Sequence, residues 1–214
     1  MVKGHITDVS DQAHIAGPKN CYGFTALTSD FDNDGWPDIF VTCDSTANLY
    51  YHNVGGKIFE EIGVPADVAS NEDGREQAGM GTATADFDGD CLLDIFKTNF
   101  ADNTHTMYKN LGKNNFEDDT IDSGLAVNTK FLRWGTAFID FDSDRWKDLI
   151  VSPTGTSILK STRDKPRRNT SSPDFFTGIA ATASSLICLR KQGRASRLCT
   201  LRAARPLEIW ITTA

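Results

Sequence analysis

The stretch that decides the fold reads Asp30-Phe31-Asp32-Asn33-Asp34-Gly35-Trp36-Pro37-Asp38-Ile39-Phe40. It returns twice, as Asp86-Phe87-Asp88-Gly89-Asp90-Cys91-Leu92-Leu93-Asp94-Ile95-Phe96 and as Asp140-Phe141-Asp142-Ser143-Asp144-Arg145-Trp146-Lys147-Asp148-Leu149-Ile150. The three copies begin 56 and then 54 positions apart. A fixed period of this length is typical of repeat proteins, in which each repeat is one supersecondary unit.

Two other markers keep the same period. Tyr51-His52-Asn53-Val54-Gly55 corresponds to Tyr108-Lys109-Asn110-Leu111-Gly112, and Met80-Gly81-Thr82-Ala83 corresponds to Trp134-Gly135-Thr136-Ala137. The Asn-x-Gly turns predict hairpins, and short apolar segments flank each acidic stretch. Residues 1–151 show no sustained helical periodicity. The sequence therefore predicts an all-β fold, a partial β-propeller of four-stranded blades.

The markers also divide the chain. We expect residues 1–20 to end a preceding blade, because residues 5–9 resemble the strand after the Asn-x-Gly turn. Residues 21–76 and 77–130 form two repeats, and 131–151 begin a third. Two full units and part of a third leave strand edges unpaired, so we expect marginal stability of the isolated chain.

Residues 152–214 break the pattern. Residues 1–151 carry 11 Lys and Arg against 26 Asp and Glu, whereas residues 152–214 carry 11 against 3. The period is lost at the same point, which predicts a non-homologous, disordered tail, frameshifted or mis-joined in origin. A basic arm that binds nucleic acid or an anionic membrane is the alternative. The acidic first segment argues against nucleic acid as its partner.

The acidic loops have the chemistry of a calcium site. When a D-x-D-x-D-G-x-x-D loop curls, the carboxylates at positions 1, 3 and 5 converge. The carbonyl at position 7 and the carboxylate at position 9 complete an oxygen shell of the kind that calcium prefers. The predicted ligands are Asp30, Asp32, Asp34, the carbonyl of Trp36, and Asp38; Asp86, Asp88, Asp90, the carbonyl of Leu92, and Asp94; and Asp140, Asp142, Asp144, the carbonyl of Trp146, and Asp148.

Competing interpretations of the loops are weaker. Zinc and copper are disfavoured because no thiol or imidazole occupies a ligand position, and magnesium prefers stricter geometry. An EF-hand needs Glu at position 12, where this chain has Val41, Lys97 and Val151. Solvated turn residues are the remaining alternative. Position 6 favours Gly, so we expect Gly35 to give the tightest loop, ahead of Cys91 and then Arg145.

The cysteines, apolar runs and histidines give little information about function. The five cysteines show no CxxC pairing and predict neither a disulfide framework nor a zinc site. No apolar run suits a membrane span or a signal peptide. The four histidines lack a catalytic spacing, and His52 is interpreted as an ordinary surface residue.

Together these loops and markers, over residues from about 5 to 151, resemble FG-GAP/VCBS repeats, which form the propeller of integrin α chains. Within this family, the chain resembles bacterial relatives of the cartilage acidic protein family, many of which end in an ASPIC/UnbV-type domain. The resemblance implies an extracytoplasmic, non-enzymatic calcium-binding propeller: a binding, scaffold or adhesion-like module with an unidentified protein or glycan ligand. The alternatives are a lectin-like propeller that stacks sugars on Trp36, Trp134 or Trp146, and a propeller hydrolase or lyase.

Overall fold

The computed structural model describes residues 6–100, 103–126, 133–140, 147–153, 186–192, 195–205 and 208–213. The described residues form strands and turns and contain no helix, which confirms the all-β prediction. None of them therefore belongs to a helix with the length and apolarity to cross a membrane.

Two four-stranded antiparallel sheets follow one another along the chain. The first contains β1 (Gly23–Ser29), β2 (Asp38–Cys43), β3 (Leu49–Val54) and β4 (Ile58–Glu61), in that order. The second contains β5 (Gly79–Ala85), β6 (Asp94–Asn99), β7 (Thr106–Asn110) and β8 (Phe116–Asp118), also in order. Each sheet is a simple meander, as expected of a propeller blade.

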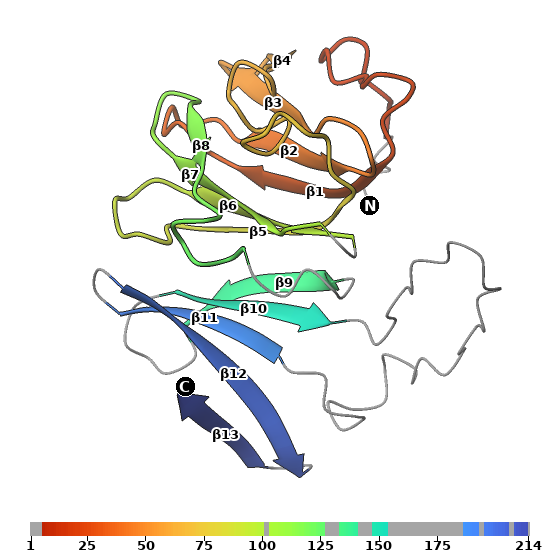
Figure 1. Ribbon diagram of the computed structural model, residues 1–214. Coiled ribbons are helices and arrows are strands. Elements are labelled where there is room, and N and C mark those ends of the chain that lie inside the picture. The colour runs from red at the N-terminus through yellow and green to blue at the C-terminus, as the bar shows by residue number, and fades with distance from the viewer. Residues whose placement is uncertain are drawn as a thin grey trace, which may run out of the picture.

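The first strands of successive blades lie next to each other, β1 beside β5 and β5 beside β9 (Arg133–Ile139) (Figure 1). Gly81 explains the repeated Gly in one sequence marker. A Cβ atom at Gly81 would lie 1.8 Å from the carbonyl oxygen of Trp134, so only glycine allows β5 and β9 to approach this closely. This arrangement is a partial propeller.

The third sheet has the order β13-β12-β11-β10-β9. After β9 it contains β10 (Asp148–Pro153), β11 (Leu186–Gln192), β12 (Ala195–Arg205) and β13 (Glu208–Thr213). These last three segments extend the sheet as strands from β10. Apolar and β-branched runs such as Leu186–Leu189 favour strand pairing, and β10 offers them an open edge. The rest of residues 154–214 lies outside the described residues.

A turn that was not foreseen repeats once per unit. The N–H groups of Ala13, Ala66 and Ser123 each donate at 2.8 Å to the carbonyl four residues earlier. The residue after each has a positive φ: His14, Asp67 and Gly124, at 59°, 62° and 76°. The strand expected just before the first of these turns is not observed, because residues 6–9 belong to no strand.

This turn connects neighbouring units. The N–H of Phe59 in β4 donates to the carbonyl of Ala13 at 2.9 Å, and the N–H of Phe116 in β8 donates to the carbonyl of Ala66 at 3.1 Å. Each fourth strand is therefore held by the turn of the preceding unit.

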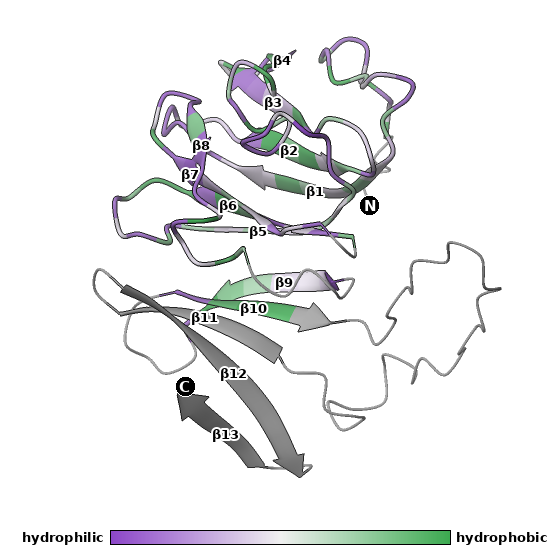
Figure 2. Cartoon of the chain, viewed as in Figure 1, coloured by the Kyte–Doolittle hydropathy of each residue, from purple (hydrophilic) through white to green (hydrophobic). Residues whose placement is uncertain are grey.

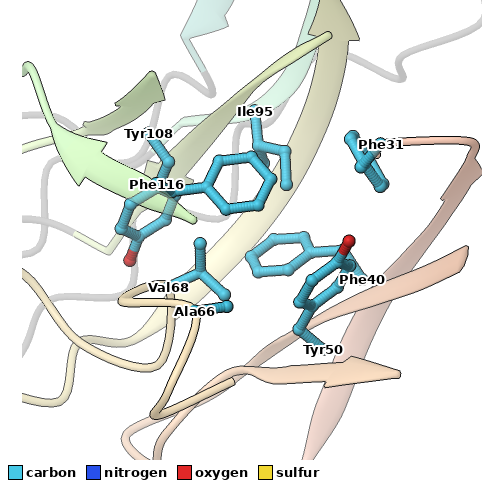
Figure 3. Close-up of a cluster of buried hydrophobic side chains, with 8 residues drawn as sticks. All are labelled: Phe31, Phe40, Tyr50, Ala66, Val68, Ile95, Tyr108 and Phe116. Carbon is cyan, nitrogen blue, oxygen red and sulfur yellow. The ribbon is translucent and has the colours of Figure 1, made fainter. Parts of the chain in front are cut away.

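The hydrophobic core lies between blades. Figure 3 shows side chains from the first and second blades meeting in one cluster, which contains Phe31, Phe40, Tyr50, Ala66, Val68, Ile95, Tyr108 and Phe116. A second cluster joins Phe87 and Phe96 of the second blade to Leu149 and Val151 of β10. The Phe of each described Asp-Phe-Asp segment, Phe31 or Phe87, is thus an anchor that fixes its acidic loop to the core.

A disulfide joins Cys21 to Cys43, with a Cα–Cα distance of 5.9 Å. The prediction that the cysteines form no disulfide is wrong for this pair. The antiparallel register that places Gly23 opposite Cys43 brings Cys21, two residues before β1, to the end of β2. Sequence spacing alone could not reveal this proximity, since it depends on the strand pairing.

Candidate metal centre

The acidic loops occupy the same place in each blade, between its first and second strands. We name residues 30–38, 86–94 and 140–148 the first, second and third acidic loops. Within the part of the chain that the structure describes, three groups of side chains could hold a metal ion, with ligand atoms within 4.8 Å of one another: Asp30, Asp32 and Asp38; Asp32, Asp34 and His52; and Asp86, Asp88 and Asp90. The structure therefore brings together carboxylates that the sequence assigned to one site in each of the first two loops.

Backbone donors hold the carboxylates of the first loop in place. Asp30 accepts from the N–H groups of Asp34 at 3.1 Å and Gly35 at 2.9 Å. Asp32 accepts from Asp34 at 3.2 Å, and Asp34 accepts from Trp36 at 2.8 Å. These bonds fix the curl of the loop.

The second loop repeats this pattern bond for bond. Asp86 accepts from Asp90 at 3.1 Å and from Cys91 at 3.0 Å, while Asp88 accepts from Asp90 at 3.3 Å. Asp90 accepts from Leu92 at 2.9 Å. Two loops that differ in four of nine residues thus adopt one geometry, which is dictated by the aspartates.

The aspartate at position 9 has a second role. Asp38 and Asp94 are buried, and each accepts the N–H of the loop phenylalanine, at 3.1 Å from Phe31 and 2.8 Å from Phe87. Asp38 also accepts the N–H of Asn53, and Asp94 that of Asn110, both at 2.9 Å. These carboxylates connect the acidic loop to the third strand of the same blade.

Burial raises the pKa of Asp94 to about 6, and the charges of Asp88 and Asp90 act in the same direction. The backbone N–H groups of Asn110 and Phe87 oppose the shift. Negative charge is therefore costly at the inner end of the second loop, which is the condition that a bound cation relieves.

In the first two loops, the residue at position 7 lies against the turn between the third and fourth strands of its blade. The Trp36 side chain is 45% exposed, and a Cβ atom at Gly56 would lie 2.4 Å from its ring, so the indole covers the β3–β4 turn. Leu92 stands in the corresponding place beside Gly112. Trp36 and Trp134 are both exposed.

Only the ends of the third loop can be placed. Asp148 is buried, like Asp38 and Asp94, and Asp140 is partly buried. Asp142, Asp144 and Trp146 lie outside the described residues.

His52 corrects two interpretations. It is not an ordinary surface residue: its side chain is 20% exposed, and its Nδ1 lies 3.1 Å from Asp38 Oδ1 and 3.5 Å from Asp32 Oδ2. An imidazole therefore does lie among the candidate ligands of the first loop, contrary to the sequence-based argument. His52 comes from β3, and strand pairing, not loop spacing, brings it there. Figure 2 shows that β3, the strand of His52, is more hydrophilic than β2, and that β7 of the second blade is likewise more hydrophilic than β10.

His105, which precedes β7, has a structural environment. Its Nδ1 accepts the N–H of Asn99 at 3.1 Å, and its ring meets Phe96 edge to face. Burial and the nearby Arg133 lower its pKa to about 3, so the imidazole stays neutral. The geometry gives it no partner for acid–base chemistry among the described residues.

Comparison with protein-family models matches residues 30–97 and 86–151 to the FG-GAP-like repeat. Each match begins at the first aspartate of one acidic loop and ends in the second strand of the next blade, so the family unit straddles two blades. A search of curated proteins finds no match.

Proposed function

Because the chain belongs to the FG-GAP-like repeat family, we propose that it is a calcium-stabilised propeller that serves as a non-enzymatic binding or scaffold module. One observation carries the calcium proposal: two loops of different sequence hold their aspartates by the same backbone bonds, with carboxylate oxygens within 4.8 Å of one another. Carboxylates held this close repel one another unless a cation neutralises them, which favours a metal site over solvated turn residues.

The donor chemistry suits a hard cation. The second loop offers only oxygen, from Asp86, Asp88 and Asp90. The first loop adds the imidazole of His52 to an otherwise all-oxygen set. Carboxylate and carbonyl oxygens favour calcium over the soft transition metals, and calcium also tolerates irregular geometry better than magnesium.

Calcium would stabilise the fold as well as shape it. With a Kd of about 10⁻⁴ M, as in extracellular modules, 1 mM calcium adds roughly 1.4 kcal/mol per site. We expect the melting temperature of the full chain to fall when EDTA replaces calcium. Asp32→Asn and Asp88→Asn should each reduce the effect, whereas Glu76→Gln, on the exposed loop before β5, should not. An identical melt in EDTA and in calcium would refute the proposal.

The compartment proposed is extracytoplasmic. The Cys21–Cys43 disulfide supports it, because structural disulfides persist in oxidising compartments and are rare in the cytosol. We also propose the finer relationship to bacterial relatives of the cartilage acidic protein and ASPIC/UnbV family, on the marker residues described above.

The ligand of the module is proposed to be a protein or a glycan. Glycan binding is the second candidate function. The exposed indole of Trp36, at position 7 of the first acidic loop, favours it because sugar rings stack on indole faces. A glycan array with wild type and Trp36→Ala tests it. Binding that is lost in the variant supports a lectin, and an empty array leaves the protein-binding module.

A further inference from the structure

A lysine on the third strand of the second blade forms an ion pair with the second acidic loop. Lys109 is on β7, and its Nζ is 2.9 Å from Asp88 Oδ2. The lysine side chain is 33% exposed and that of Asp88 16%, so the pair sits at the edge of the loop. The ammonium thus neutralises one of the three carboxylates that could hold a metal ion there.

The first loop has a different side chain in this place. His52 and Lys109 each precede the buried asparagine, Asn53 or Asn110, whose N–H binds the position-9 aspartate. Both side chains reach the carboxylate at position 3 of their own loop, Asp32 or Asp88. A neutral imidazole can offer a lone pair to a cation, whereas an ammonium has only donors and carries a full positive charge.

We propose that Lys109 is a tethered cation that competes with calcium for Asp88, so that the second loop binds calcium more weakly than the first. This inference rests on the proposed calcium function. The ion must displace the ammonium from an oxygen it would ligate, and it is repelled by the charge that remains nearby. Because Lys109 is partly exposed, it can swing towards solvent, so the effect is competition and not exclusion.

The size of the effect follows from charge and distance. A unit charge and a divalent ion a few ångströms apart at an exposed site repel by on the order of 1–2 kcal/mol, which corresponds to about tenfold in affinity. Loss of a surface ion pair contributes less. The lysine therefore weakens calcium binding by the second loop independently of Cys91, whose φ of 70° is unfavourable for a residue other than glycine.

The experiment isolates the second loop in the full chain. Asp32→Asn and Asp34→Asn remove the first site, Asp140→Asn weakens the third, and calorimetric calcium titration follows the second. In this background, Lys109→Met should raise affinity about tenfold, while Lys109→Arg, which keeps the charge, should leave it near that of the parent. In the otherwise wild-type chain, His52→Lys should lower the calcium affinity of the first loop by a similar factor.

Each outcome bears on one proposal. No calcium binding by wild type overturns the calcium function and this inference with it. Calcium binding by wild type with equal affinities for Lys109→Met and its parent overturns the role of Lys109 alone. If the background chain binds nothing, His52→Lys decides: weakened binding supports the inference, and unchanged binding overturns it.

Discussion

The side-chain amide of Asn114, in the β7–β8 turn, donates to Asp32 Oδ2 in the first acidic loop at 2.7 Å. The two residues belong to neighbouring blades, 82 positions apart. The Oδ1 of the same amide lies 2.5 Å from the hydroxyl of Tyr50 on β3. One asparagine of the second blade therefore orients a candidate ligand of the first, which makes that metal site a feature of two blades.

We expect Asn114→Ala to weaken calcium binding at the first loop by about 10-fold, because residues that orient metal ligands have effects of this size. Calorimetric titration measures the change. Asn115→Ala is the matched control, since Asn115 is adjacent and exposed. Equal affinities for the two variants would show that Asp32 is oriented without help from the second blade.

The backbone at position 6 gives a second prediction. Gly35 has a φ of 93°, with nothing within 4 Å of a Cβ atom placed there, and Cys91 has a φ of 70°. Gly35→Ala should cost about 1–2 kcal/mol through backbone strain alone, and Cys91→Gly should recover part of a similar cost in the second loop. Urea unfolding in EDTA measures both.

A control separates strain from metal binding. Gly74 also has a positive φ, 71°, and open space around it, but it lies in the loop before β5. Gly74→Ala should reduce stability without changing calcium affinity, whereas Gly35→Ala should reduce both. A Gly35→Ala chain with wild-type calcium affinity would contradict the role of this residue in the loop.

Local chemistry made much of the fold predictable. The left-handed backbone at Gly35 and Cys91, the antiparallel strands on either side of each loop, and the convergence of Asp86, Asp88 and Asp90 all depend on residues close in sequence. The repeat period made the other blades predictable, because the strand order of one correctly interpreted blade applies to the next.

What escaped prediction depends on contacts between strands. His52 reaches the first loop from β3, and Cys21 reaches Cys43 only through the β1–β2 register. The turn at residues 9–15 was missed because its three copies share a backbone conformation and few side chains. The ninth-position aspartates were assigned to the metal, and the strand-joining bonds of Asp38 and Asp94 could not be read from spacing.

The disulfide gives a third prediction. Cys21 and Cys43 are 22 positions apart, and closing a loop of this size in the unfolded chain stabilises the fold by about 3 kcal/mol. We expect Cys21→Ser to lower the free energy of unfolding by that amount. Cys91→Ser, at the exposed free cysteine, should change it little. Reductant should lower the stability of the wild-type chain to that of Cys21→Ser. A wild-type melt that is unchanged by reductant would argue against the disulfide.

The fourth prediction concerns Lys97, which is buried on β6 where the other two repeats have Val41 and Val151. Among the described residues its Nζ has no hydrogen-bond partner, and it lies 5.7 Å from the centre of the Tyr108 ring. Burial lowers its pKa to about 7, which the charge of Asp118 partly opposes. The folded chain therefore holds a lysine that is half neutral near pH 7.

The sign of the pH dependence follows from this pKa. Between pH 7 and the ordinary lysine value of 10.5, the unfolded chain binds a proton that the folded chain does not, so stability rises with pH. From pH 7 to pH 9 the gain amounts to about 2 kcal/mol. Lys97→Met, of similar volume, should be more stable than wild type at pH 7 and should lack this rise.

Urea unfolding of both chains at several pH values between 7 and 9 measures the difference, in which titrations common to the two chains cancel. The upper limit matters because burial raises the pKa of Tyr108, which makes the folded state less favourable at still higher pH. Lys113→Met, at an exposed lysine in the β7–β8 turn, controls for loss of a positive charge. Parallel stability curves for wild type and Lys97→Met would mean that the ammonium stays charged inside the blade interface, with a partner that compensates its burial.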